Sequence, residues 1–158
     1  MNRTLLKVAA VAAVQLALVG AAVAPRLSAR VTGEEYRLRV APVDPIDPFR
    51  GAYVDLDYPD LRTEEAPAGN GPLYVSLVRD GDVWTAGTVS RTRPSGTPYL
   101  ACDDRDWRVR CGIESWFLPQ DEAAGLQDRL GDGGLVAVVK VDGRGHAALV
   151  RVEAGAGS

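Results

Sequence analysis

The feature that most constrains this chain is a long apolar stretch close to its N-terminus. From Val8 to Ala24 the sequence reads VAAVAAVQLALVGAAVA, seventeen residues in which Gln15 is the only polar side chain. A helix without a polar face must be buried all round or lie in lipid, and a membrane-spanning helix needs about 17–25 such residues. We therefore predict a transmembrane or signal helix within residues 1–30, with residues 5–24 in the membrane.

Two interpretations of this segment remain open, an uncleaved anchor and a cleaved signal peptide. Cleavage after Ala24 would leave Pro25 directly beyond the cut, which signal peptidases tolerate badly, whereas cleavage after Ala22 stays possible. The proline favours the anchor. A short basic N-terminus favours the cytoplasm for that end, so we expect a single-pass protein of the cell membrane with a cytoplasmic N-terminus and an extracytoplasmic C-terminal domain.

Charge divides the chain at the same point as hydropathy. Residues 1–30 carry four basic side chains and no acid, whereas the remaining residues hold fourteen basic and 21 acidic side chains, a net charge of −7. Such a domain cannot neutralise nucleic-acid phosphates over a broad surface. Its net charge also disfavours docking flat on anionic lipid. We expect no nucleic-acid partner, and as partner another envelope or integral membrane protein.

The two cysteines are consistent with an extracytoplasmic location. Cys102 and Cys111 lie nine positions apart without a competing cysteine, so one disulfide is possible. Disulfides persist in oxidising compartments, and closing this ten-residue loop should stabilise the fold by about 2.5–3 kcal/mol. A zinc site would need two further ligands, and His146 is the only histidine. Two unpaired thiols remain the alternative if the domain is not exported.

Beyond residue 30 the chain has the pattern of a β-rich domain. Apolar and polar residues alternate within short segments that are separated by turns rich in Gly, Pro, Asn and Asp. The predicted strands cover residues 34–40, 52–58, 73–79, 83–90, 107–113, 115–118, 135–141 and 146–152. We predict a mainly β fold, an antiparallel barrel- or sandwich-like domain over residues 31–153 with one short helix at 119–130, followed by a disordered tail at 154–158.

The most distinctive stretch of the chain is PVDPIDPFRGAYVDLDYP at residues 42–59. Within it, residues 51–58 resemble the motif that names the GDYXXLXY family of membrane-anchored bacterial proteins, with Ala52 where the family has Asp. Residues 112–119 (GIESWFLP) look like the second block of that family, and VDGRGHAALV at 141–150 is similar to its closing hairpin. The resemblance covers nearly the whole chain. It implies an anchored envelope protein but carries no biochemical activity with it.

The candidate site residues lie in these blocks. One interpretation is structural, because Asp-Pro pairs and a glycine form the turns that lead into a strand. The functional interpretation is a polar surface for a partner or ligand, with Arg50, Tyr53, Asp55 and Asp57 on it. The full candidate set is Asp44, Asp47, Arg50, Gly51, Tyr53, Asp55, Asp57, Tyr58 and Glu114, with Cys102 and Cys111 as a disulfide.

We expect a binding or assembly domain with no catalytic residue, cofactor or metal. The alternative is an anchored envelope hydrolase that uses Glu114 or a pair of Asp residues as general acid and base. Glu114 could instead pair with Arg108 or Arg110. The acids within 44–60 and 103–106 suggest calcium by composition, although their spacing does not match the twelve-residue calcium loop. Carriage of a small ligand would require an apolar cavity.

Overall fold

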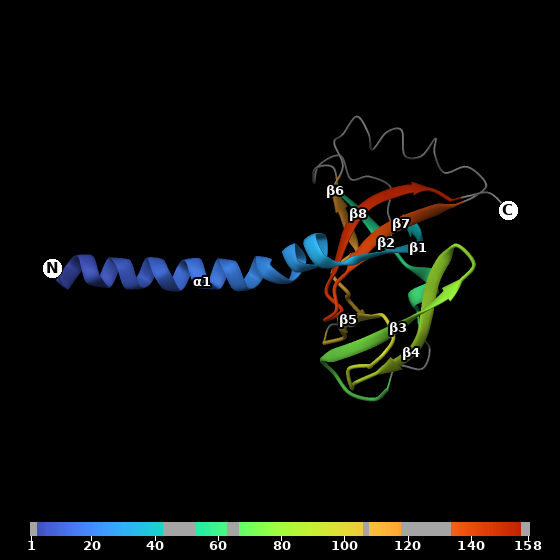
Figure 1. Ribbon diagram of the computed structural model, residues 1–158, viewed down its shortest axis with the longest axis horizontal. Coiled ribbons are helices and arrows are strands. Elements are labelled where there is room, and N and C mark those ends of the chain that lie inside the picture. Colours follow the sequence, from blue (N-terminus) through green and yellow to red (C-terminus); the bar gives the residue numbers. More distant parts are fainter. Residues whose placement is uncertain (1–2, 43–52, 63–66, 106–107, 118–133, 156–158) are drawn as a thin grey trace.

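The computed structural model describes residues 3–42, 53–62, 67–105, 108–117 and 134–155. These residues form a long N-terminal helix and a β-rich domain (Figure 1). The elements are α1 (Arg3–Thr32), β1 (Glu34–Pro42), β2 (Tyr53–Asp57), the 3-10 turn η1 (Pro59–Leu61), β3 (Pro72–Asp80), β4 (Val83–Ser90), β5 (Tyr99–Asp103), β6 (Ser115–Phe117), β7 (Leu135–Val141) and β8 (Ala147–Ala154). The helix predicted at 119–130 lies outside the described residues.

Helix α1 projects away from the β-domain for most of its length (Figure 1). It is long and apolar enough to cross a membrane, and its apolar stretch is not covered by any other described part of the chain. A helix of this kind at the N-terminus fits an anchor or a signal sequence. Its 30 residues span about 45 Å, more than the ~30 Å of a bilayer's hydrocarbon layer.

The strands form two antiparallel sheets, which confirms the predicted mainly β fold. The larger sheet has the order β6-β2-β1-β7-β8, and the smaller sheet has the order β4-β3-β5. The described strands do not close into a barrel. Of the two predicted forms, barrel-like and sandwich-like, the structure therefore has the second, with two packed sheets. Tyr36 of β1 and Trp84 of β4 join them edge to face, with ring centroids 5.0 Å apart.

The core lies between the sheets and follows the alternation in the sequence. Tyr36, Leu38 and Val40 of β1 are all buried, as are Leu56 and Tyr58 at the end of the family motif. They pack in one cluster with apolar residues of β3, β5 and β7. Because side chains alternate across a strand, the intervening residues are left for the outer faces.

The strand predicted at 107–113 is wrong: the described residues 108–113 form no strand, and the backbone of Arg110 makes only an isolated β-bridge with Asp103. The sequence prediction also missed β5.

Two strands run two residues beyond their predicted ends. β1 continues to Pro42, which pairs with Leu56, although proline offers no N–H to a ladder. β8 continues to Ala154, which pairs with Leu135, and the Gly155 N–H donates to the Gly134 carbonyl at 2.9 Å. The first two residues of the predicted tail are therefore held by the sheet, and residues 156–158 lie outside the described part.

Candidate functional site

Two of the three sequence blocks that carry the family resemblance, the motif and the second block, lie side by side. Strand β2 pairs with β6 in an antiparallel register that places Asp55 opposite Ser115. The pairing is extended by the Leu56 N–H, which donates to the Glu114 carbonyl at 2.7 Å. Residues that are far apart in the sequence thus form one local structure at an edge of the larger sheet.

The last tyrosine of the motif is a buried structural residue. The Tyr58 side chain is 7 % exposed, and its hydroxyl donates to the Ile113 carbonyl at 2.8 Å. Burial, with a smaller effect from the charge of Glu114, raises the pKa of Tyr58 far above its usual value. The phenol therefore stays protonated and keeps donating across the physiological range of pH.

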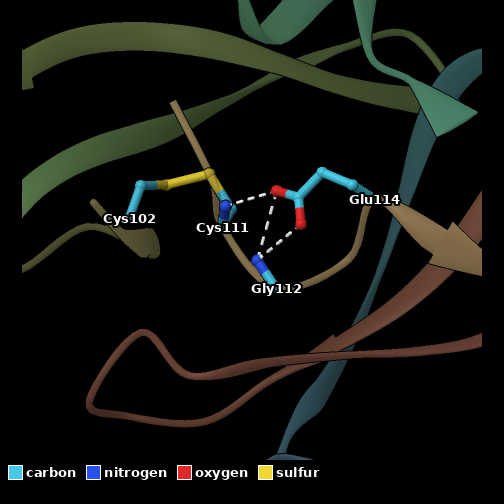
Figure 2. The surroundings of a disulfide bond; sticks show 4 residues. All are labelled: Cys102, Cys111, Gly112 and Glu114. Carbon is cyan, nitrogen blue, oxygen red and sulfur yellow. Dashed lines mark hydrogen bonds between the residues drawn. A yellow bond between two sulfur atoms is a disulfide. The ribbon is translucent and has the colours of Figure 1, made fainter. Parts of the chain in front are cut away.

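Glu114 uses its carboxylate to hold the chain beside the disulfide. Its oxygens accept hydrogen bonds from the backbone N–H groups of Cys111 and Gly112, the latter at 3.0 Å (Figure 2). Cys111 is joined to Cys102 with an S–S distance of 2.01 Å, the disulfide that the sequence predicts. Sequence reasoning gave Glu114 an arginine partner or a catalytic role, and it missed these backbone donors.

We call Tyr58, Cys102, Cys111 and Glu114 the clasp. Cys102 belongs to β5 of the smaller sheet. Tyr58 directly follows β2 and Glu114 directly precedes β6, and these two strands belong to the larger sheet. The clasp therefore connects the two sheets through a covalent bond and through hydrogen bonds to backbone groups. Its members are held by the fold, and none presents a free reactive group that would suggest catalysis.

The outward residues of the motif strand have a different environment. Asp55 is exposed, and Asp57 is half-buried in an ion pair with Arg62, whose Nη2 lies 2.6 Å from Oδ2. Tyr53 pairs with Phe117 in the register of β2 and β6, and its side chain lies outside the described part of the structure. The structure thus brings Asp55, Asp57, Tyr58 and Glu114 into one neighbourhood. The predicted site residues Asp44, Asp47, Arg50 and Gly51 lie outside the described residues.

A second polar cluster lies where α1 meets the domain. The Ser28 hydroxyl donates to Asp142 Oδ2 at 2.6 Å, and His146 Nδ1 lies 3.1 Å from the same oxygen. Asp142 Oδ1 accepts the backbone N–H groups of Arg144 and His146 at 2.8 and 3.0 Å. We call Ser28, Asp142 and His146 the joint. Because the serine bonds to the aspartate and not to the histidine, this is not the relay of a serine hydrolase.

The carboxylate of Asp142 is the centre of the joint. Burial alone would raise the pKa of Asp142, but the hydrogen bonds from Ser28, Arg144 and His146 outweigh it and lower the pKa below its usual value. The carboxylate is therefore ionised near neutral pH. Sequence reasoning assigned Asp142 to a turn and missed its hydrogen bond to Ser28. No local sequence pattern indicates a contact between two residues 114 positions apart.

The end of α1 fits closely against β7. Ala29 is fully buried, and a Cβ on Gly33 would lie 2.3 Å from the Ala29 carbonyl oxygen and 2.9 Å from the Val141 nitrogen. Only glycine permits this approach. Lys140 Nζ donates to the Arg30 carbonyl at 3.3 Å, which suits the negative end of a helix. Helix and domain are therefore held together over several contacts.

Two of the acids in the cysteine loop that suggested calcium, Asp103 and Asp104, are bonded to arginines, and Asp106 lies outside the described residues. Asp104 accepts two hydrogen bonds from the Arg91 guanidinium, at 2.9 and 2.5 Å, and these bonds do most to lower the pKa of Asp104, to about 2. Asp103 pairs with Arg105 at 3.0 Å. Across the described residues no cluster of His, Cys, Asp and Glu could hold a metal ion.

A family model described as GDYXXLXY protein matches residues 15–152 of the chain. This chain belongs to the GDYXXLXY family. The match includes the motif, the second block and the closing hairpin, so the resemblance seen in the sequence is confirmed. Comparisons with curated proteins and with solved structures gave no significant match. In this GDYXXLXY protein, the motif leucine, Leu56, is a core residue, and the last tyrosine of the motif, Tyr58, belongs to the clasp.

Proposed function

We propose that this GDYXXLXY protein is a membrane-anchored extracytoplasmic domain that binds or assembles with another envelope or integral membrane protein and catalyses no reaction. The observation that carries the proposal is the division of β2 into two faces. Leu56 is buried in the core, whereas Asp55 on the other face is exposed. A strand that is fixed in the core by one face and presents an exposed acid on the other suits recognition of a partner.

The membrane location is supported by α1 and by the disulfide. The apolar part of α1 finds no cover in the described protein, and lipid would supply it. The Cys102–Cys111 bond is of the kind that persists outside the reducing cytoplasm. The helix thus supports a membrane segment, and the disulfide supports an extracytoplasmic domain; the anchor is favoured over a cleaved signal by Pro25.

A hydrolase gains little support from the site. A general acid or base must reach the substrate within hydrogen-bond distance, and the Glu114 carboxylate is already bonded to two backbone N–H groups. Asp57 is paired with Arg62. Among the described residues proposed for hydrolysis, Glu114 and Asp57 therefore have structural partners.

The test is crosslinking in living cells from the outward face of β2. A photoreactive residue in place of Asp55 should capture one membrane protein repeatedly, whereas the same residue at Arg79, near the far end of β3, should not. The captured protein should then bind purified wild-type chain, and Asp55→Arg should weaken that binding about tenfold or more while Arg79→Glu leaves it unchanged. Absence of any adduct from Asp55, or equal binding by both variants, would contradict the proposal.

Topology is tested separately. A reporter enzyme that is active only outside the cytoplasm should be active when fused after Ser158, and a reporter active only inside should be silent. The chain should also keep its N-terminal residues when its intact mass is measured from membranes. Activity of the cytoplasmic reporter would reverse the proposed orientation.

A further inference from the structure

Exposed arginines surround the point where α1 enters the domain. Arg26 and Arg30 are on the last turns of α1, Arg93 is in the loop between β4 and β5, and Arg144 is in the turn between β7 and β8. Arg93 Nη2 donates to the Arg144 carbonyl at 3.5 Å, and Arg30 Nη2 to the Leu149 carbonyl at 3.4 Å. We call these four arginines the basic rim.

Among the described residues, the rim differs from most other surface arginines in having no acidic partner; Arg79 is an exception elsewhere on the domain. Within the described part of the chain, no carboxylate pairs with any of its four arginines. Ion pairs are the rule elsewhere on the domain, where the pairs are Arg37–Glu153, Arg39–Asp60, Arg62–Asp57, Arg91–Asp104, Arg105–Asp103 and Arg151–Glu35. The one acid at the centre of this end, Asp142, is buried and bonded to Ser28. Glu34 is exposed beside it and accepts the Tyr36 hydroxyl at 3.2 Å.

The joint fixes the depth of the rim relative to the membrane. Ser28 lies four residues beyond Ala24, the last residue of the apolar stretch, which is about 6 Å along a helix. The polar headgroup layer on each side of a bilayer is about 5–8 Å thick. Since Asp142 is hydrogen-bonded to Ser28, the turn that carries Arg144 would lie at the level of the lipid phosphates.

We propose that the basic rim binds the phosphate groups of anionic phospholipids and thereby sets the orientation of the domain on the membrane. This inference rests on the proposed function, because it requires α1 to span the bilayer. Guanidinium groups bind phosphate with charge-assisted, often bidentate hydrogen bonds. The domain as a whole carries a net charge of −7, so an anionic membrane repels its other faces and attracts the rim.

The experiment uses the full chain in lipid nanodiscs of phosphatidylcholine, with or without about one third phosphatidylglycerol. Hydrogen–deuterium exchange is measured in the peptides that contain the 142–146 turn and the 91–98 loop. We expect exchange in both to slow with phosphatidylglycerol at low salt, by up to about fivefold for each arginine engaged. The effect should disappear at 0.5 M salt, since screening weakens surface electrostatics.

Matched variants separate lipid binding from folding. Arg93→Gln with Arg144→Gln should remove the phosphatidylglycerol effect, and Arg93→Lys with Arg144→Lys should keep most of it. Arg79→Gln is the control, because Arg79 is exposed, forms no ion pair among the described residues and lies close to the β3–β4 turn, at the end of the domain away from α1 (Figure 1). Equal exchange in the two lipids, or an effect that survives in the glutamine variant, overturns the proposal.

Two failures remain distinguishable. If α1 does not insert, the chain will not copurify with nanodiscs on gel filtration, and the anchored function fails together with this inference. If the chain copurifies but exchange does not depend on phosphatidylglycerol, the inference alone fails. Crosslinking from Asp55 tests the partner independently of either result.

Discussion

The clasp and the joint both connect parts of the molecule that are distant in the sequence, and they do so by different chemistry. The clasp joins two sheets through a disulfide, a buried phenol and a carboxylate bonded to backbone N–H groups. The joint connects helix to sheet through a buried carboxylate that accepts side-chain and backbone hydrogen bonds. The clasp therefore stabilises the β-domain itself, whereas the joint sets the position of the β-domain relative to α1.

The difference shows where each structure is vulnerable. A disulfide stabilises chiefly by restricting the unfolded chain, so its loss should weaken the whole domain. Hydrogen bonds to a single charged centre depend on that charge, so loss of the charge should loosen the helix and the adjacent turn first. The two sites can therefore be separated by variants and by pH.

The largest effect should come from breaking the clasp. Replacement of Cys102 and Cys111 by Ala should lower the free energy of unfolding by about 2.5–3 kcal/mol, because a ten-residue loop is no longer closed. Urea denaturation of the full chain in detergent, followed by tryptophan fluorescence, measures the change. Reductant should produce a similar loss in the wild type and none in the variant. A loss below about 1 kcal/mol would show that the sheets are held without the disulfide.

Next comes the centre of the joint. Asp142→Asn should cost about 2 kcal/mol, since hydrogen bonds to a charged group contribute about 1.5–3 kcal/mol. Hydrogen exchange should rise at the end of α1 and in the 142–146 turn, with little change around Tyr58. Ser28→Ala is the matched control, and it should loosen the helix end but not the turn. Equal effects of both variants on the turn would contradict the central role of Asp142.

Acid should destabilise the joint, as the Asp142→Asn substitution does. The folded-state pKa of Asp142 lies below its usual value near 3.8, so the stabilisation is present above about pH 4 and is lost as the pH falls further. The stability lost in acid through Asp142 should not exceed the stability lost in the Asp142→Asn variant. Exchange at residues 29–33, corrected for intrinsic rates, should rise between pH 4 and pH 2 in the wild type. The same profile in Asp142→Asn would falsify this assignment.

A smaller loss is expected from the phenol of the clasp. Tyr58→Phe removes the hydrogen bond to the buried Ile113 carbonyl and should cost about 1–1.5 kcal/mol while keeping the ring in the core. Urea denaturation measures it under the conditions used for the cysteine variant. An unchanged midpoint would show that water replaces the hydroxyl and that the tyrosine is not required for stability.

The smallest effect should come from the outward face of β2. Arg62→Ala removes the ion pair with Asp57 and should change stability by less than about 1 kcal/mol, because Arg62 is exposed. The same variant is informative in the crosslinking assay, where it leaves Asp57 unpaired. A large destabilisation would place this face of the motif among the structural residues.

Much of the domain could be predicted from local patterns. The strands at 34–40, 73–79 and 83–90 were predicted within two residues at their ends, because alternation and Asp-Gly turns act over a few residues. The buried set of β1 followed from the same alternation. The disulfide followed from having only two cysteines. These inferences need no knowledge of what lies across the fold.

The candidate site could be predicted only in part. Asp55, Asp57, Tyr58 and Glu114 were all selected from the sequence, yet three of them, Asp57, Tyr58 and Glu114, proved to have structural partners. Alternation predicted that Tyr58 faces inward but could not show that its hydroxyl meets Ile113. For Glu114, proximity in sequence favoured arginine partners, whereas a tight turn brought backbone N–H groups within reach.

The sequence by itself determined that this chain has an apolar helix, an acidic β-rich domain, one possible disulfide and membership in the GDYXXLXY family. Tertiary structure alone decided that Ser28 meets Asp142 and that Tyr58 is joined to the second block. It also decided that arginines with no carboxylate partner among the described residues gather where the helix enters the domain. The physical reason is the range of the interactions. Periodicity, turns and composition act between neighbours, whereas the clasp, the joint and the basic rim arise only when chain folding brings distant residues together.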